Sequence, residues 1–332
     1  MPFPKEFLFI GVAAIVLVVL IIAIVSGISR CTSSQPEEAE SSAESQEASQ
    51  QEEVVLNPDI SEDLRWRDTD FAVDPARTTW STKSNGRKVV YLTIDDGPSD
   101  LTEKYLDLFD QYNVKATFFV TGHDPNYYNL IHEAYKRGHT IGLHSMTHDY
   151  ETIYASEQAF LSDLDAIGQV VKQQIGYVPC FIRFPGGSSN TVGKEGVMPK
   201  LVTDVQKLGY QYYDWNAETG DGMDMTTAQL IETTKGEGLE ENIILLAHDA
   251  PTKQTTLEAL PTIIEYYQGL GYSFEAIDRD TVTCHHTIIV DTGKSGSSED
   301  AEGEDGESTD EGDGVEGETD AAGDENAETA EA

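Results

Sequence analysis

Basic residues are scarce in this chain. Of its 332 residues, 21 are Lys or Arg and 60 are Asp or Glu, so the formal net charge is −39 at pH 7. Two flanking stretches carry much of this negative charge, but the part between them is acidic as well. A surface that binds nucleic acid or an anionic lipid needs clustered positive charge. The composition therefore argues against both kinds of partner.

Cysteines are few, and nucleotide-binding motifs are missing. Three cysteines exclude a disulfide scaffold. Cys180 and Cys284 could pair outside the cell or remain two small buried thiols, and the sequence leaves both alternatives open. No G-x-G-x-x-G follows the first predicted strand and the chain has no P-loop, which argues against a nucleotide as partner.

One long hydrophobic run stands near the start of the chain. Residues 7–28 carry no charge and are long enough to cross a bilayer as a helix. A cleaved signal peptide is one alternative, with Ser26-Gly27 as a weak cleavage site, and Cys31 raises the alternative of a lipoprotein. We expect an uncleaved N-terminal anchor over residues 1–31 that crosses the membrane once.

The flanks of the remaining chain lack the apolar residues that a folded core needs. Residues 32–60 predict a disordered acidic linker, and residues 291–332 predict a disordered acidic tail. Residues 61–86 are interpreted as a lead-in segment. This leaves residues 87–290 as the folded domain.

Apolar runs rich in strand-forming residues alternate with segments of helical spacing throughout this domain. The predicted strands span residues 89–94, 116–120, 140–143, 181–184, 211–215, 243–247 and 273–277. The predicted helices span residues 101–109, 130–135, 160–171, 197–208, 228–234 and 257–267. This alternation predicts an α/β fold with a parallel sheet, either a barrel or an open doubly wound sheet.

Ionisable and glycine-rich residues follow the predicted strands. In parallel α/β sheets, catalytic groups collect at the carboxyl ends of the strands. Here these ends carry, in chain order, Asp95-Asp96, His144, His148, Arg183, Gly186, Trp215, Glu218, Asp221 and His248. The clustering predicts one functional site at that edge of the sheet.

The residue types at these strand ends indicate a metal. His144 and His148 are spaced by one helical turn, which would put both imidazoles on one side, although such pairs also occur without a metal. Two histidines and one carboxylate leave positions open for water and substrate, as in hydrolytic zinc sites. Because adjacent residues of an extended chain point to opposite faces, Asp95 and Asp96 are suited to different tasks, base and ligand.

Five motifs together resemble a known family. They are T-I-D-D-G-P at 93–98, H-S-x-x-H at 144–148, R-x-P at 183–185, W-x-x-E-x-x-D at 215–221 and L-x-H at 246–248. Their order and approximate spacing resemble the polysaccharide deacetylase family, which is the NodB-homology domain of carbohydrate esterase family 4. The resemblance covers about residues 88–280. It implies an α/β fold, a distorted (β/α) barrel with about seven parallel strands, here preceded by the predicted transmembrane helix.

The resemblance implies a divalent metal and a general base. Asp96, His144 and His148 would ligate the metal, with Zn²⁺ expected and Co²⁺ as the alternative. Asp95 would take a proton from the attacking water. Arg183 would keep Asp95 ionised and oriented, since a nearby cation lowers the pKa of a carboxylate.

The resemblance also implies an acid and a substrate pocket. His248 would protonate the departing amine, with Asp221 orienting its ring. Leu246 and Trp215 would line the groove that receives the acetyl methyl group. The backbone N–H near Gly186 would help to bind the oxyanion.

Two glycines depart from the family pattern. Gly186 stands where many members have an aromatic residue, and Gly222 stands where a Trp is often found. Aromatic platforms for a sugar are therefore missing at both positions, while the catalytic set is complete. Outside the motifs, His285-His286 are expected to be a solvated pair, and His139 a surface or local structural residue.

The expected activity is metal-dependent removal of N-acetyl groups from a cell-envelope glycan, with N-acetylglucosamine of peptidoglycan as the substrate. The alternatives are an N-acetylmuramic acid deacetylase, an O-acetyl esterase acting on a polysaccharide such as xylan, and a non-catalytic glycan-binding protein. The expected location is the cell membrane, with one membrane pass and the catalytic domain on the extracellular side.

Overall fold

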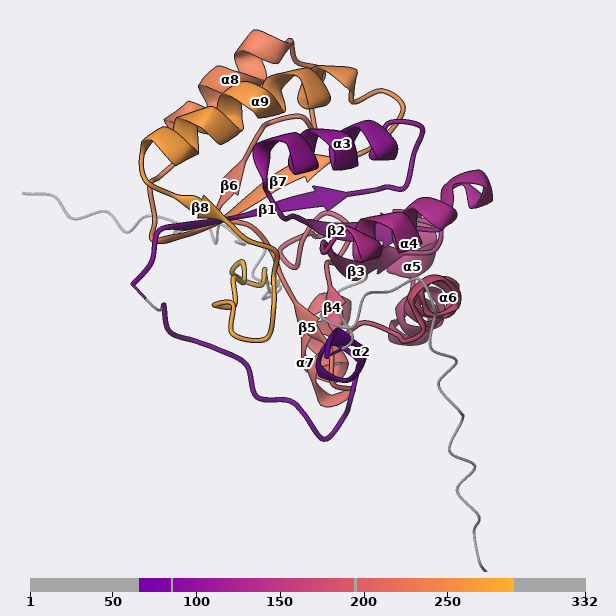
Figure 1. Ribbon diagram of the computed structural model, residues 1–332. Coiled ribbons are helices and arrows are strands. Elements are labelled where there is room, and N and C mark those ends of the chain that lie inside the picture. Colours follow the sequence, from indigo (N-terminus) through magenta and orange to yellow (C-terminus); the bar gives the residue numbers. More distant parts are fainter. Residues whose placement is uncertain (1–65, 85, 194–195, 290–332) are drawn as a thin grey trace, which may run out of the picture. The chain divides into compact units, whose positions relative to one another are not determined.

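The computed structural model describes residues 66–84, 86–193 and 196–289 (Figure 1). The predicted anchor at 1–31, the linker at 32–60 and the tail at 291–332 lie outside these residues. Within the described part of the chain, no helix is both long and apolar enough to span a bilayer.

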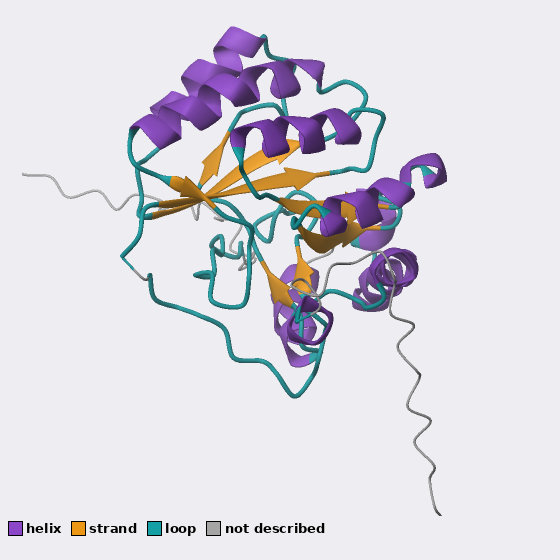
Figure 2. Cartoon of the chain, in the orientation of Figure 1, coloured by secondary structure: helices purple, strands orange, loops and turns teal. Residues whose placement is uncertain are grey.

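A parallel sheet forms the centre of the domain (Figure 2). Seven strands follow one another in the order β5-β4-β3-β2-β1-β7-β6, and β8 pairs with the first residues of β1. All pairings between named strands are parallel. The strands are β1 (Val89–Asp95), β2 (Thr117–Thr121), β3 (Thr140–Ser145), β4 (Phe181–Ile182), β5 (Gln211–Tyr212), β6 (Ala217–Glu218), β7 (Asn242–His248) and β8 (Ser273–Phe274).

Helices cover the sheet. In Figure 1, α3, α8 and α9 lie over β1, β7 and β6, whereas α4 and α6 lie beside β2 and β3. The helices are α2 (Arg67–Asp70), α3 (Thr102–Tyr112), α4 (Asn129–Lys136), α5 (Tyr150–Ile153), α6 (Glu157–Ile175), α7 (Val197–Lys207), α8 (Thr227–Gly236), α9 (Gln254–Gly269) and the short 3₁₀-helix η2 (Pro125–Tyr127). The curled α/β arrangement fits the expected distorted barrel with about seven parallel strands.

The seven predicted strands and six predicted helices are all present. Strands β4, β5 and β8 have two residues each and end earlier than predicted. The sequence reasoning missed β6, α2, α5 and η2, because elements of two to four residues are too short to show a hydrophobic period.

The core explains why the central strands were predictable. Every residue of β1, β2 and β3 is buried. Parallel strands that are buried on both faces read as nearly continuous apolar runs. The described part of the predicted lead-in also packs on this core: Phe71 is buried, and its ring lies 5.0 Å from that of Phe181.

Strand register brings the site residues together. Asp95, the last residue of β1, lies beside His248, the last residue of β7. On the other side, Leu143 of β3 pairs with Ile182 of β4, so the next residues, His144 and Arg183, are also neighbours. Residues from distant parts of the sequence thus meet at one edge of the sheet.

Candidate active site

Two adjacent carboxylates end the central strand. Asp95 is buried, whereas the side chain of Asp96 is 20% exposed. Asp96 has a left-handed backbone (φ 74°), which Asp tolerates better than most residues. The prediction that the two side chains point to opposite faces assumed extended backbone and is therefore wrong. The left-handed residue turns both carboxylates toward His144, whose Nε2 lies 3.8 Å from Asp95 Oδ2 and 3.6 Å from Asp96 Oδ1.

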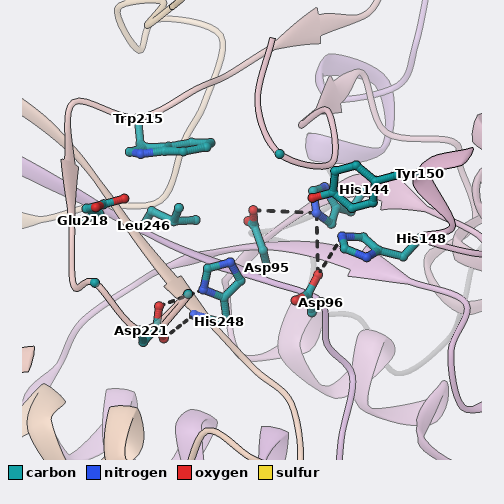
Figure 3. Close-up of a pocket in the computed structure, with 13 residues that line it drawn as sticks. Asp95, Asp96, His144, His148, Tyr150, Trp215, Glu218, Asp221, Leu246 and His248 are labelled. Atoms are coloured by element: carbon teal, nitrogen blue, oxygen red, sulfur yellow. Dashed lines mark hydrogen bonds and ion pairs between the residues drawn. The ribbon is translucent and has the colours of Figure 1, made fainter. Parts of the chain in front are cut away.

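The three expected metal ligands form a cluster (Figure 3). Asp96 Oδ1 lies 3.6 Å from His144 Nε2 and 3.3 Å from His148 Nε2. A tetrahedral zinc site with bonds of roughly 2.0–2.2 Å separates its ligand atoms by about 3.3–3.6 Å. Asp96 Oδ1 is also buried without a hydrogen-bond partner among the described residues, a state that a cation would relieve. The donor set therefore fits a divalent ion.

The protonation of His144 suits a metal ligand. Its Nδ1 lies 2.8 Å from the backbone oxygen of Arg183. A carbonyl only accepts hydrogen bonds, so Nδ1 carries the proton and the lone pair of Nε2 faces Asp96. Burial lowers the pKa of His144 to about 3, which keeps the ring neutral.

His148 reaches the cluster through a turn and not through a helix. His144 lies in β3, which ends at the next residue, and His148 has a left-handed backbone (φ 52°). The backbone N–H of His148 donates to Ser145 Oγ over 2.8 Å. The assumed helical spacing of the two imidazoles is therefore wrong, although the imidazoles do meet.

Asp163 of α6 holds this turn in place. Its carboxylate accepts hydrogen bonds from Ser145 Oγ (2.6 Å), from the backbone N–H of Met146 (2.8 Å) and from both the N–H (3.0 Å) and the hydroxyl (2.8 Å) of Thr147. Sequence reasoning missed Asp163, because it lies well outside the motif and reads as an ordinary polar position of an amphipathic helix.

Arg183 is fully buried beneath the site. Its Nη1 lies 2.8 Å from Asp95 Oδ1 and 2.7 Å from Thr93 Oγ1, and Nε and Nη2 donate to the backbone oxygens of Tyr213 and Asp214. Burial raises the pKa of Asp95, and the positive charge of Arg183 opposes this rise. Arg183 does lower the pKa of Asp95, as expected, but the effect of burial is larger, so the pKa is raised.

His248 and Asp221 form an ion pair across the pocket from the metal ligands (Figure 3). His248 Nδ1 lies 2.7 Å from Asp221 Oδ1, and the backbone N–H of His248 donates to Asp221 Oδ2. Burial lowers the pKa of His248, but the hydrogen bond and charge of Asp221, with Asp95 and Asp96, raise it to about 9. His248 is thus an imidazolium at neutral pH.

These residues surround a pocket of about 250 Å³. Nine of the ten predicted site residues line it; Arg183 lies behind Asp95 and does not. Figure 3 shows Trp215 and Leu246 on the wall opposite the metal ligands. The full lining comprises Asp95, Asp96, His144, His148, Tyr150, Gly186, Trp215, Glu218, Gly220, Asp221, Gly222, Leu246 and His248.

Tyr150 was missed by the sequence reasoning. It lies two residues after His148, and their rings meet edge to face at 5.3 Å. Burial, together with the charges of Asp96 and Asp95, raises the pKa of Tyr150, so the phenol stays protonated at neutral pH. Its proximity in sequence to H-S-x-x-H was the only available signal.

The two late histidines support the wall of the pocket. His286 Nε2 lies 2.8 Å from the backbone oxygen of Trp215, and the backbone N–H of His286 donates to the buried carboxylate of Asp214. The ring of His285 stacks on Tyr212 at 3.8 Å. His286 therefore departs from the expected solvated pair, whereas His285 is exposed, as expected, although its ring stacks on Tyr212.

His139 and the cysteines are structural. His139 is fully buried, and its Nδ1 accepts the N–H of Ala116. Cys180 and Cys284 are free thiols, so the alternative of a disulfide between them is not realised. Burial raises the pKa of Cys180 to about 12 and that of Cys284 to about 11.

Relatives with the same sequence pattern are known. The sequence profile of the polysaccharide deacetylase family matches residues 82–213. YheN of Bacillus subtilis, which is named as a polysaccharide deacetylase, is 32% identical over 212 residues, 61% of this chain and 72% of YheN. A peptidoglycan-N-acetylglucosamine deacetylase of Bacillus cereus is 29% identical over 212 residues, 61% of this chain and 75% of that protein.

A solved structure shares the fold. The catalytic domain of peptidoglycan N-acetylglucosamine deacetylase from Eubacterium rectale is 42% identical to this chain, and the TM-score is 0.61. The superposition covers 65% of this chain and 100% of that domain. The fold and the site are those of a hydrolase that removes acetyl groups. Within that class, the chain belongs to the polysaccharide deacetylase family.

Proposed function

We propose that this protein is a metal-dependent N-deacetylase that acts on N-acetylglucosamine of peptidoglycan. One observation carries the proposal: a buried carboxylate beside a metal-ligand cluster faces a protonated imidazole across a single pocket. The substrate is inferred from relatives that are named peptidoglycan N-acetylglucosamine deacetylases.

Amide hydrolysis requires help on both sides of the scissile bond. An acetamide carbonyl is a poor electrophile, and an amine leaves poorly unless it is protonated. A divalent ion held by Asp96, His144 and His148, for which we propose Zn²⁺ with Co²⁺ as the alternative, would supply Lewis-acid polarisation of the carbonyl and activation of water.

Asp95 is the proposed base. Its carboxylate lies beside the ligand cluster and accepts the proton of the attacking water. Arg183 fixes the carboxylate from behind through the 2.8 Å ion pair. Because burial raises the pKa of Asp95, its ionised carboxylate is a stronger base than one in water, and the positive charge of Arg183 opposes this rise.

His248 is the proposed acid. Its protonated ring lies on the opposite side of the pocket and donates a proton to the leaving nitrogen. Asp221 orients the ring and stabilises its positive charge. Leu246 and Trp215 offer an apolar wall for the acetyl methyl group, and the backbone N–H near Gly186 offers a donor to the oxyanion.

We further propose that the protein is anchored in the cell membrane by residues 7–28, with the catalytic domain outside. The charge-free run and the location of peptidoglycan support this arrangement. Fractionation of cells and protease treatment of intact protoplasts would test it. Recovery of the full chain in the soluble fraction, or protection of the catalytic domain from protease, would contradict it.

The activity is tested by acetate release. The full chain, purified in detergent, should release acetate from peptidoglycan and chitooligosaccharides after loading with Zn²⁺ but not after treatment with a chelator. Asp95→Asn should lower the rate by about 10²- to 10⁴-fold. Asp100→Asn, at an exposed carboxylate in the next loop, is the matched control and should leave the rate unchanged.

The same assay separates the alternatives. Faster release from acetylated xylan than from N-acetylated substrates would identify an O-acetyl esterase, an alternative motivated by a bifunctional xylanase/deacetylase of Pseudobutyrivibrio xylanivorans that is 30% identical over 198 residues. Mass spectrometry of muropeptides locates the lost acetyl group, so deacetylated N-acetylmuramic acid would shift the substrate to that sugar. Full activity of the chelated protein would refute the metal dependence.

A further inference from the structure

Tyr150 places a phenol hydroxyl over the metal-ligand side of the pocket. The residue begins α5, directly after the turn that carries His148. Its ring packs edge to face on the rings of His148 (5.3 Å) and Tyr154 (6.0 Å). Tyr150 lines the pocket, and Figure 3 shows its hydroxyl at the end of the ring that faces Asp95.

The hydroxyl of Tyr150 has no hydrogen-bond partner among the residues that the structure describes. The neighbouring Tyr154 differs, because its hydroxyl donates to the backbone oxygen of Pro185 over 2.8 Å. The hydroxyl of Tyr154 therefore has a structural role. The proton of Tyr150 is free for a molecule that enters the pocket.

Gly186 provides the room for this ring. A Cβ atom at position 186 would lie 2.9 Å from Cε1 and 3.0 Å from the hydroxyl oxygen of Tyr150. Any side chain there would push the ring away, and the left-handed backbone of Gly186 (φ 74°) disfavours other residues as well. The glycine and the tyrosine therefore form one arrangement: the ring from α5 fills the space beside the backbone of residue 186.

The pocket has few other side-chain donors. Asp95, Asp96, Glu218 and Asp221 are carboxylates, which only accept hydrogen bonds when ionised. His248 holds its proton for the leaving nitrogen in the proposed function. The indole nitrogen of Trp215 lies toward Glu218, at the far end of the pocket (Figure 3).

We propose that Tyr150 is a further catalytic residue, whose hydroxyl donates a hydrogen bond to the acetyl carbonyl oxygen as negative charge develops on it. This inference rests on the proposed function. A hydrogen bond from a fixed donor to that oxygen is stronger in the transition state than in the ground state. Loss of the donor therefore lowers kcat more than it raises KM. No proton is transferred; the phenol remains neutral throughout.

Tyr150→Phe tests the role, because it keeps the ring on His148 and removes only the hydroxyl. With Zn²⁺-loaded full-length protein and a chitooligosaccharide, kcat should fall by about 10- to 100-fold, with KM changed by no more than about twofold. Tyr112→Phe is the matched control: its hydroxyl donates to Glu265 on the surface, away from the pocket. Its rate should equal that of the wild type.

Acetate binding gives a readout that does not depend on turnover. Acetate is the product of any acetyl removal and presents carboxylate oxygens to the same donor. Calorimetry on the Zn²⁺-loaded proteins should show an affinity for acetate about 10- to 150-fold lower in Tyr150→Phe than in the wild type, a loss of the size expected for one hydrogen bond to a charged group.

The outcomes are distinct. Wild-type kcat and wild-type acetate affinity in Tyr150→Phe would overturn the inference. A raised KM in Tyr150→Leu together with wild-type kinetics in Tyr150→Phe would also overturn it, because the ring would then serve only as a sugar platform. If the wild type releases no acetate from any glycan, the proposed function fails and the catalytic role of Tyr150 fails with it, while the acetate affinities still show whether its hydroxyl donates to a ligand in the pocket.

Discussion

The ion pair between Asp221 and His248 sets the pH range in which the proposed acid is protonated. The two side chains are 2.7 Å apart and largely buried. Burial alone lowers the pKa of His248, and the contact with Asp221 is the main cause that raises it to about 9. A bound divalent cation offsets the smaller contributions of Asp95 and Asp96, so Asp221 is the partner whose effect persists in the loaded enzyme.

Asp221→Asn keeps the shape of the side chain and removes its charge. We expect the pKa of His248 to fall from about 9 to its ordinary value of 6.5 or below, since burial then acts with less opposition. At pH 7.5 the protonated fraction would fall from about 97% to about 9%, so loss of the proton alone lowers the rate about tenfold.

The assay is kcat/KM measured from pH 5 to 10 on a chitooligosaccharide. The alkaline loss of activity should occur at a higher pH in the wild type than in Asp221→Asn, because Asp221 raises the pKa of His248. The variant should therefore recover part of its activity near pH 6. An unshifted alkaline limb would refute this assignment. A uniform loss at every pH would show that Asp221 acts through geometry and not through the pKa.

Three further predictions concern metal binding, stability and thiol reactivity. Asp163→Asn should weaken zinc binding by about 10- to 100-fold, because three residues of the His148 turn depend on that carboxylate. The free energy of unfolding of the metal-free protein should fall by up to about 3 kcal/mol as the pH rises from 6.5 through 9, because folded His248 binds its proton more tightly than an unfolded histidine does. Cys180 and Cys284 should react slowly with a thiol reagent at pH 8, because burial raises the pKa of both.

Each of these has its own control. Asp165→Asn changes an exposed carboxylate on the same helix and should keep wild-type zinc affinity; equal affinity in both variants would exclude a role for Asp163. Denaturant unfolding should show that the free energy of unfolding of His248→Gln does not fall as the pH rises from 6.5 through 9. The same fall in the variant as in the wild type would assign the pH dependence to another group. Peptide mapping after labelling reads the two cysteines separately, and rapid modification of either in the folded protein would contradict its raised pKa.

The sequence alone determined the strand and helix alternation and most of the residues that surround the pocket. Strands β1, β2 and β3 are buried on both faces, so they appear as apolar runs along the chain. Parallel strands present their carboxyl ends at one edge of the sheet, so polar residues that follow such runs meet there. The pattern of apolar runs is therefore enough to predict that Asp95, His144 and His248 lie close together.

Only the tertiary structure decided how these side chains are aimed. The left-handed backbones of Asp96 and His148 break the extended and helical geometries that sequence spacing assumes. The support from Asp163 and the position of Tyr150 over Gly186 depend on packing between segments that no period in the sequence connects. Periodic patterns record which residues are buried in regular elements. The direction of a side chain in a turn is set by contacts with distant parts of the chain, and those contacts exist only in the folded protein.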